Sequence, residues 1–375
     1  MSSHLFTTTK HTIPASYPRE FPGGSQTLSS EPALQLVLNQ YTPHSFTPCS
    51  AHTDNPLTII FAHANGFHKE MYEPFFDDLL VYLERQGVKV RAIWAIDAAT
   101  HGESAKVNDW ILGDHPSWND YARDIQHTIT HFAAQMPEPR LGMGHSMGAQ
   151  AIFQSALYSP RLYNAIFALD PVIEPDVPDT FPPFAAIATS KRRDCWPSRE
   201  EAEKFFRSKP FYQAWDPRVL ELHLKYGLTD LPTATYPTGK GVTLTTTKYR
   251  EVHTYAHPKP GSPTETYRPE TNQTFEDLPR LQVPRIFYAF GEKSSICQAD
   301  SRAEKQRRNP RAVCGVLEGG SHFICFEMPG ELAKMVGGWA LETETWRTNE
   351  ISVLEKSSSL GRCSTSLIQE HWKDH

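Results

Sequence analysis

The pentapeptide Gly144-His145-Ser146-Met147-Gly148 constrains the possible fold of this 375-residue chain more than any other feature. It has the form Gly-x-Ser-x-Gly, with a short apolar run before it and a segment able to start a helix after it. This context is typical of a nucleophile elbow, a sharp strand-to-helix turn that exposes the serine hydroxyl. Glycines at the outer positions leave room for the turn because they carry no Cβ. The pattern therefore predicts Ser146 as a nucleophile, and the alternative is an ordinary glycine-rich turn.

Apolar runs alternate with helical periodicities on both sides of this motif. The runs expected to form strands are residues 32–41, 57–62, 88–96, 164–169, 284–290 and 312–317. The segments expected to form core helices are residues 71–86, 118–136 and 331–344. Such an alternation favours βαβ units over a sandwich. We therefore predict an α/β fold with a mostly parallel central sheet flanked by helices.

The alternation stops after Pro171, where the sequence becomes dense in proline, aromatic and charged residues. We expect this stretch to form a cap, or lid, inserted into the α/β core. Both ends of the chain are polar and weakly periodic, so we expect them to be flexible. The predicted order is a flexible N-terminal segment, the first part of the core, the cap, the second part of the core and a flexible tail, over residues 1–30, 31–171, 172–282, 283–344 and 345–375.

Composition argues against several classes of function. The net charge is −6 and no basic run is present, so we expect no nucleic-acid partner. The six cysteines lack C-x-x-C spacing, so we expect neither a disulfide framework nor a metal site, and no cofactor. The first ten residues lack the apolar stretch of a secretory signal, and no run approaches the roughly 20 apolar residues of a membrane span. These features predict an intracellular protein that acts on a small molecule.

A serine hydroxyl is a weak nucleophile until a positioned base takes its proton. In the chain order Ser, acid, His, that base lies downstream of the serine. His322 directly follows the late strand expected at residues 312–317, on a loop opened by two glycines. Ligands of parallel sheets bind at this carboxyl edge. We therefore predict His322 as the general base, against the alternative of an ordinary structural histidine.

The acid that orients the base is less clearly marked. The loop after the strand at residues 284–290 commonly supplies it, but Ser294 stands where an aspartate is expected. Glu292 and Asp300 lie nearby, off the expected spacing. Asp170 comes at the end of the strand expected at residues 164–169. It therefore lies at the carboxyl edge of the sheet, the same edge as Ser146 and His322. We predict Asp170 as the acid and keep Glu292 and Asp300 as alternatives; a turn-forming aspartate before proline is the structural alternative for Asp170.

Hydrolysis of an acyl group also requires an oxyanion hole, made of two backbone N–H groups aimed at the developing negative charge. The first is expected from Met147, directly after the nucleophile. The second is expected from the loop that follows the strand at residues 57–62. That loop reads His63-Ala64-Asn65-Gly66-Phe67, and we predict Asn65 as the donor. The alternative for Asn65 is a plain Asn-Gly turn.

The sequence resembles the α/β-hydrolase superfamily over roughly residues 55–340. The motifs that carry the resemblance are Phe61–Phe67, Asp97 with His101–Ser104, Gly144–Gly148 and Gly319–Phe323. More narrowly, the chain is similar to fungal hydrolases of the peroxisomal lipase type. Among these it resembles the hydrolases of the Alternaria host-selective toxin clusters (AK-, AF- and ACT-toxin), on the stretches Ala62–Phe75, Gly144–Gly148 and Leu169–Ile173.

This narrower resemblance implies a role in making the epoxy-decatrienoic acid part of a toxin, and residence in the peroxisome. The printed chain ends Trp372-Lys373-Asp374-His375, which is not a peroxisomal S-K-L type tripeptide. Without import into the peroxisome, we expect the protein in the cytoplasm.

Taken together, the motifs predict a serine hydrolase acting on an acyl ester or thioester, with the cap walling an apolar acyl pocket. Two alternatives stay open. One is a non-catalytic or diverged protein of the same fold, suggested by Ser294. The other is an epoxide hydrolase-like activity, which is disfavoured because such enzymes usually need a carboxylate nucleophile where Ser146 stands.

Overall fold

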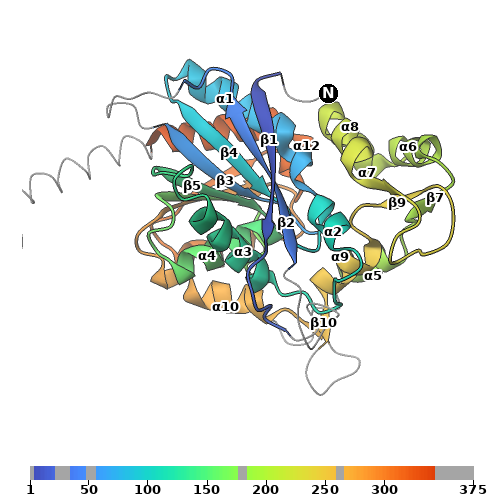
Figure 1. Cartoon of the computed structure of the whole chain (residues 1–375). Coiled ribbons are helices and arrows are strands. Elements are labelled where there is room, and N and C mark those ends of the chain that lie inside the picture. Colours follow the sequence, from blue (N-terminus) through green and yellow to red (C-terminus); the bar gives the residue numbers. More distant parts are fainter. Residues whose placement is uncertain (1–3, 22–33, 48–55, 176–183, 259–265, 343–375) are drawn as a thin grey trace, which may run out of the picture.

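The computed structural model describes residues 4–21, 34–47, 56–175, 184–258 and 266–342. Eight strands form the central sheet, in the order β1-β2-β4-β3-β5-β6-β12-β13 (Figure 1). Their bounds are β1 (Phe6–Pro14), β2 (Gln35–Pro43), β3 (Leu57–Ala62), β4 (Val90–Ile96), β5 (Arg140–His145), β6 (Ala165–Leu169), β12 (Arg285–Gly291) and β13 (Val313–Leu317). In this sheet, β4, β3, β5, β6, β12 and β13 pair in parallel. Strands β1 and β2 lie at one edge, where β1 pairs antiparallel with β2 and β2 pairs antiparallel with β4. The predicted α/β fold is confirmed.

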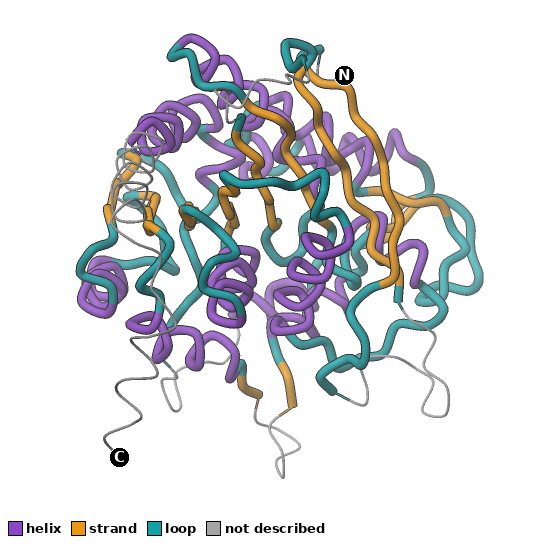
Figure 2. The backbone as a smooth tube through the Cα atoms, turned by 60° about the vertical axis from the view of Figure 1, so that its left-hand side comes forward, coloured by secondary structure: helices purple, strands orange, loops and turns teal. Residues whose placement is uncertain are grey.

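Helices cover both faces of this sheet (Figure 2). Successive residues of β3 show why: Ile59 and Phe61 pack into one apolar cluster and Ile60 into the other. Side chains alternate between the faces of a strand, so a fully apolar strand needs cover on both sides. The first cluster includes α1 (Glu73–Arg85), α12 (Ile324–Glu327) and the helix over residues 329–342. The second includes α2 (Gly102–Asn108), α3 (Trp118–His131), α4 (Met147–Tyr158) and α10 (Pro269–Asp277).

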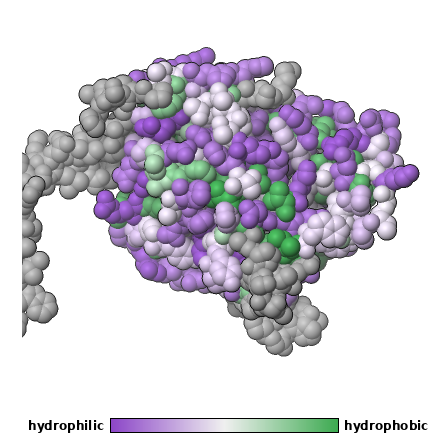
Figure 3. Space-filling view, in the orientation of Figure 1, coloured by the Kyte–Doolittle hydropathy of each residue, from purple (hydrophilic) through white to green (hydrophobic). Residues whose placement is uncertain are grey.

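The N-terminal prediction was wrong in part, because Phe6–Pro14 is not a flexible segment but the edge strand β1. Its sequence, FTTTKHTIP, gave no strand signal because only Phe6 and Ile13 are buried and the residues between them are mostly exposed. The face of the molecule on which β1 and β2 run is largely hydrophilic (Figure 3). A polar edge strand of this kind gains its order from backbone pairing rather than from side-chain burial. Residues 345–375 and 22–30 of the predicted flexible segments lie outside the described residues.

The predicted cap contains a separate set of short elements beside the sheet (Figure 1). They are α5 (Phe184–Ser190), β7 (Cys195–Trp196), α6 (Arg199–Arg207), α7 (Pro210–Gln213), α8 (Pro217–Tyr226), β8 (Leu228–Asp230), β9 (Val242–Leu244) and α9 (Lys248–Tyr255). Strands β7, β9 and β8 form a small antiparallel sheet. After a β10–β11 pair (His257–Pro258 with Thr266–Tyr267), α10 and η3 (Leu278–Arg280) lead back to the core.

The end of the predicted cap, at residue 282, lies too late in the chain. Helix α10 packs on the core instead, where the Gln150 side-chain amide donates to the Thr274 hydroxyl at 2.9 Å. Phe275 belongs to the same apolar cluster as α4. The proline and charge of this stretch concealed a core helix, because its buried side chains include threonines as well as apolar residues.

Candidate active site

Ser146 occupies the turn between β5 and α4, with φ 57° and ψ −116°. A positive φ is strained for any residue other than glycine, and strain of this kind concentrates at functional sites. The two outer glycines permit the turn. A Cβ on Gly144 would lie 2.4 Å from the Gly148 carbonyl oxygen, and one on Gly148 would lie 2.2 Å from the Ala62 carbonyl oxygen. Both positions therefore exclude any side chain.

Asp170 comes directly after β6, the neighbour of β5, and is also held at a positive φ, 43°. Its carboxylate is fully buried. One oxygen accepts a hydrogen bond from the Gly291 amide at 2.9 Å, and the other accepts one from the Ser294 hydroxyl at 2.6 Å. Both donors belong to the end of β12 and the loop after it, on the other side of β6. Ser294, which stands where an aspartate was expected, thus donates a hydrogen bond to the carboxylate of Asp170 after the neighbouring strand β6.

His322 lies in the loop after β13 and joins the other two residues. Its Nδ1 is 2.6 Å from Asp170 Oδ1, and its Nε2 is 3.0 Å from Ser146 Oγ. The alternative acids have other positions: Glu292 accepts a hydrogen bond from the Gly319 amide, and Asp300 lies in the first turn of α11 (Ala299–Arg308). The structure thus brings Ser146, His322 and Asp170 into a single hydrogen-bonded chain.

The charge distribution around the hydrogen-bonded residues Ser146, His322 and Asp170 suits a serine nucleophile. Burial acts to raise the pKa of Asp170, but the hydrogen bond and charge of His322, with the donors Ser294 and Gly291, hold that pKa below its usual value. The carboxylate therefore stays ionised near neutral pH. An ionised acid can hold the imidazole with its proton on Nδ1 and stabilise the imidazolium that forms when Nε2 takes the serine proton.

Two backbone N–H groups are available near the serine for an oxyanion. Among the described residues, the amides of Met147 and Asn65 have no acceptor in the protein, whereas the Ala64 amide donates to the Tyr72 hydroxyl at 3.0 Å. The Asn65 side chain is occupied at both ends. Its oxygen is 2.8 Å from His101 Nε2, and its amide donates to the Glu251 carbonyl of α9 at 3.2 Å. Any oxyanion contact from Asn65 would therefore come from its backbone.

Aromatic side chains line the boundary between the core and the cap beside His322. We call Phe67, Phe211, Trp215 and Phe323 the aromatic wall. Phe323 lies 5.0 Å from Phe211 of α7, and Phe67 lies 5.8 Å from Trp215, measured between ring centroids. Phe211 is 44% exposed and Phe67 and Phe323 are partly exposed, so the wall presents apolar surface next to His322.

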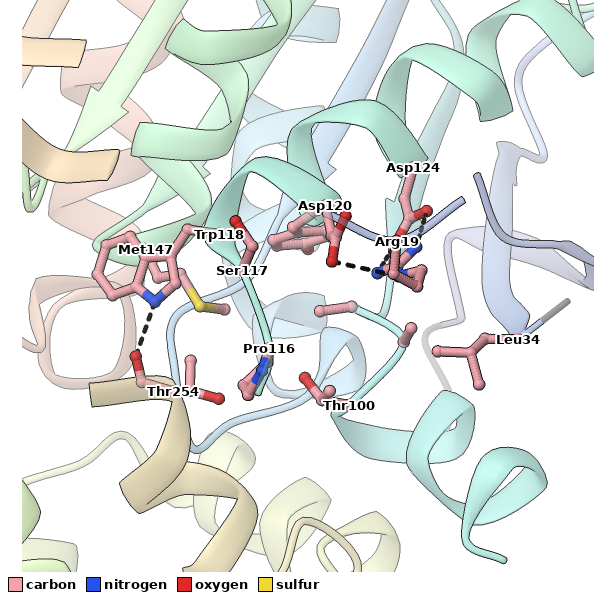
Figure 4. A pocket seen from close by; sticks show the side chains of 13 residues that line it. Arg19, Leu34, Thr100, Pro116, Ser117, Trp118, Asp120, Asp124, Met147 and Thr254 are labelled. Carbon is pink, nitrogen blue, oxygen red and sulfur yellow. Dashed lines mark hydrogen bonds and ion pairs between the residues drawn. The ribbon is translucent and has the colours of Figure 1, made fainter. Parts of the chain in front are cut away.

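A separate small cavity lies behind the elbow, on the side of the Met147 side chain (Figure 4). Trp118 and Thr254 border it, and its other end is closed by Arg19, which pairs with Asp124 at 2.7 Å. The cavity volume is about 20 Å³, room for about one water molecule and far too small for an acyl chain. This cavity is therefore not a binding site for an acyl chain.

Three residues that form hydrogen bonds around Ser146, His322 and Asp170 were not predicted from the sequence: Ser294, Tyr72 and His145. Ser294 stood out only as a departure from an expected aspartate, and Tyr72 and His145 as parts of motifs with no role of their own. Burial, with His322 beside it, lowers the pKa of His145 to about 3, so this residue stays neutral. Its position inside the Gly-x-Ser-x-Gly motif was the one available signal.

A parallel sheet, a strained serine between strand and helix, and a hydrogen-bonded histidine and aspartate at the carboxyl edge define a protein of the α/β-hydrolase class. The chain belongs to the Alpha/beta hydrolase family, whose sequence model matches residues 59–335.

Relatives with similar sequences come from fungi. A type I acyl-CoA thioesterase, mpaH' of Penicillium brevicompactum, is 32% identical over 99% of this chain and 95% of its own length. The abhydrolase domain-containing protein AFT2-1 of Alternaria alternata is 32% identical over 33% of this chain and 46% of its own length. The predicted likeness to Alternaria hydrolases is thus confirmed, but the match to the Penicillium thioesterase covers far more of the chain.

Among solved structures, the peroxisomal alpha-beta-hydrolase Lpx1 of Saccharomyces cerevisiae matches 96% of this chain and 100% of its own, with a TM-score of 0.77 and 19% identity. At that identity the likeness concerns the fold. Within the described residues, no helix is long and apolar enough to cross a membrane.

Proposed function

We propose that this protein is a serine hydrolase that cleaves acyl thioesters, with acyl-CoA as its substrate class. The observation that carries the proposal is the continuous hydrogen-bonded chain from Asp170 through His322 to Ser146. The three residues follow three separate strands at one edge of the sheet, and Ser146 is held in a strained turn that places its hydroxyl 3.0 Å from His322 Nε2.

The reaction follows from this geometry in two halves. Ser146 Oγ attacks the thioester carbonyl while His322 Nε2 takes its proton, and the Met147 and Asn65 amides receive the charge on the carbonyl oxygen. The C–S bond then breaks, and His322 returns the proton to the leaving thiolate. In the second half His322 deprotonates water, which attacks the acyl-serine carbonyl. The bond between that carbon and Ser146 Oγ then breaks, His322 returns the proton to Oγ, and the carboxylic acid is released.

Two observations favour a thioester with an apolar acyl group. The relative that matches nearly the whole chain is named as an acyl-CoA thioesterase. The aromatic wall beside His322 offers apolar surface for an acyl group of that kind, since ligand pockets are lined mainly by apolar and aromatic side chains.

A biosynthetic role in host-selective toxin formation and residence in the peroxisome are further proposals, which rest on resemblance. The Alternaria relatives support the first over one third of the chain only. The Penicillium relative spans nearly all of it, so we place the acyl-CoA proposal ahead of a toxin-specific substrate.

The test is release of free thiol from a series of acyl-CoAs of increasing chain length, compared with hydrolysis of p-nitrophenyl esters of the same acyl groups. We expect higher kcat/KM on the thioesters. Ser146→Ala should lower kcat by at least about 10³-fold, because the residual rate of an enzyme without its nucleophile comes from binding and the oxyanion hole alone.

Ser155→Ala is the matched control, because Ser155 is a buried serine of the same helix that bonds to Ile152 and Tyr163 instead of to the triad. Its activity should equal that of the wild type. Equal turnover by Ser146→Ala would overturn the serine mechanism. A folded wild type that neither turns over any substrate nor reacts with a fluorophosphonate would favour the non-catalytic alternative, and turnover of epoxides alone would favour the epoxide hydrolase.

A further inference from the structure

A buried chain of hydrogen bonds connects the two loops on either side of Ser146. The Ala64 amide donates to the Tyr72 hydroxyl at 3.0 Å, and that hydroxyl lies 2.8 Å from His145 Nδ1. At the other side of the ring, His145 Nε2 is 2.8 Å from the carbonyl oxygen of His322. We call this connection the Tyr72–His145 bridge. It runs from the loop over residues 63–67, which we call the oxyanion loop, to the backbone of the proposed base His322.

The direction of each hydrogen bond follows from the groups involved. A carbonyl oxygen accepts only, so His145 donates to His322 from Nε2. The neutral ring then has an unprotonated Nδ1, which accepts from the Tyr72 hydroxyl. That hydroxyl in turn uses its oxygen to accept from the Ala64 amide. All donors and acceptors are therefore satisfied in a single arrangement, and the imidazole has one tautomer.

The surroundings make this arrangement hard to replace. Tyr72 and His145 are both fully buried, and Phe326 packs against each ring, at 5.1 Å and 5.6 Å between centroids. Water has no access to take over a lost partner. A buried polar group left without a partner costs about 1–3 kcal/mol. Removing one member of the bridge therefore either lowers the free energy of unfolding by about that amount or shifts the loops until the remaining groups find other partners.

The bridge ends at two places that matter for the proposed chemistry. Ala64 directly precedes Asn65, whose backbone N–H we assign to the oxyanion hole. The His322 carbonyl belongs to the residue whose Nε2 lies 3.0 Å from Ser146 Oγ. Between them, His145 is the residue immediately before the nucleophile. One network thus reaches the nucleophile, the base and the oxyanion loop from behind.

We propose that Tyr72 and His145 are positioning residues that fix the Asn65 amide and the His322 imidazole relative to each other across Ser146. This inference rests on the serine-hydrolase function proposed above. Neither residue touches the substrate. Their effect is to keep the donor and the base at the separation that the tetrahedral intermediate requires, and losses of this kind fall on kcat rather than on substrate binding.

The test uses the rate of Ser146 labelling by a fluorophosphonate, because this reaction needs the nucleophile, base and oxyanion hole but not the natural substrate. We expect Tyr72→Phe to lower the labelling rate at least tenfold. On a p-nitrophenyl ester, kcat should fall by a similar factor while KM stays within about twofold.

His145 allows a graded comparison. In His145→Gln the side-chain amide can still donate to the His322 carbonyl, whereas His145→Leu loses both hydrogen bonds. We expect labelling rates in the order wild type, His145→Gln, His145→Leu. A residue that only fills space would give the opposite order or none, since leucine is the better core residue.

Tyr163→Phe is the matched control, because Tyr163 is another fully buried tyrosine whose hydroxyl bonds at 2.9 Å to Ser155, away from the catalytic loops. It should lose comparable stability and keep the wild-type labelling rate. A folded Tyr72→Phe that labels as fast as Tyr163→Phe would overturn the inference. A wild type that does not label at all would instead overturn the proposed function, so the two failures are distinguishable.

Discussion

Asp170, which we propose as the catalytic acid, follows a strand next to the one whose loop commonly supplies an aspartate and here holds Ser294. The loop that commonly supplies the aspartate here supplies a hydroxyl, which donates to Asp170 at 2.6 Å. With the Gly291 amide and His322, the carboxylate has three hydrogen-bond partners in a fully buried position. Ser294 is therefore compatible with a working acid, and it does not by itself favour a non-catalytic protein.

We expect Asp170→Asn to lower kcat by about 10²–10⁴-fold while the protein stays folded. The amide has no negative charge to stabilise the imidazolium, and its NH₂ can force His322 into the wrong tautomer. Asparagine tolerates the positive φ of this position, so a loss of folding is not the expected cause. The measurement is kcat on an acyl ester together with the thermal unfolding midpoint.

Ser294→Ala serves as the graded comparison and should lower kcat by no more than about tenfold. It removes one of the three hydrogen bonds to Asp170 and two from the Ile296 and Cys297 amides, but it leaves the charge of the carboxylate. Full activity of Asp170→Asn would show that another carboxylate serves as the acid. Glu292→Gln and Asp300→Asn would then be the next variants to measure.

The positions of the proposed nucleophile Ser146 and the proposed base His322 were predictable from the sequence, because each lies in a short motif directly after a strand. Asp170 was predictable only as the best of three candidates, because the order of strands in the sheet decides which carboxylate meets His322. The supporting roles of Ser294 and Tyr72 could not be predicted. Each acts on a residue more than 70 positions away along the chain, and nothing in the spacing of the sequence records that contact.

At the scale of elements, the first turn of α4 lies directly against the end of β3. Gly148, in its first turn, faces the carbonyl oxygens of Ala62 and His63, where a Cβ would lie 2.2 Å and 2.7 Å away. These are backbone atoms of β3 and the oxyanion loop, which cannot turn aside as a flexible side chain can. The helix, the strand and the loop therefore share one fixed geometry.

We expect Gly148→Ala to lower the free energy of unfolding by about 1–3 kcal/mol or more, because overpacking against backbone cannot be relieved locally. Ester turnover by the folded variant should also fall, because the displaced backbone atoms include those of the oxyanion loop. Urea unfolding and ester turnover measure the two effects. Gly330→Ala is the control, because its Cβ would meet nothing closer than 3.5 Å; equal effects of the two substitutions would contradict the argument.

Fully buried strands were predictable as continuous apolar runs, and Leu57–Ala62 has the predicted bounds. Edge elements were not. Strand β1 is held by nine backbone pairs with β2, from Phe6 opposite Pro43 to Pro14 opposite Gln35, and its polar side chains resemble those of a loop. Pairing with a distant segment decides such a strand, and composition does not reveal it.

At the scale of the whole molecule, buried charges gather between the oxyanion loop and the end of β4. Lys69 is fully buried and pairs with Glu70 and Asp97, each at 2.6 Å. Glu73 begins α1 directly after the short helix η2 (Lys69–Tyr72), and its carboxylate accepts a hydrogen bond from the Tyr41 hydroxyl at 3.0 Å. Burial raises the pKa of Glu73 to about 7. The fold therefore favours the protonated form of Glu73, whereas the charge of Lys69 and the hydrogen bond from His68 hold the pKa of buried Glu70 below its usual value.

This shift predicts how stability depends on pH. The unfolded chain ionises Glu73 near pH 4.5, but the folded protein does so only near pH 7. Its contribution to stability is thus complete below about pH 4.5 and is lost as the pH rises to about 7. The difference amounts to about 3 kcal/mol at most.

Glu73→Gln, which mimics the protonated form, should remove this dependence. Urea unfolding at pH 5 and pH 8 should show a drop in stability that is about 2 kcal/mol smaller in the variant than in the wild type. Glu318→Gln, at an exposed position, is the control and should behave as the wild type. An unchanged drop in Glu73→Gln would show that Glu73 ionises in the folded protein as it does in the unfolded chain.

The contact of Asn65 with the cap also limits how this fold can be re-engineered or diversified. The Glu251 carbonyl of α9 holds the Asn65 side chain, and Thr246 just before that helix accepts a hydrogen bond from the Gly102 amide of the core at 2.9 Å. Residues 246–251 thus form one fixed contact between the cap and the core, in addition to the contacts that α8 makes through Arg218 and Asp78. A cap transplanted from another enzyme to change selectivity would have to keep this contact, or the graft would alter the rate of every substrate at once.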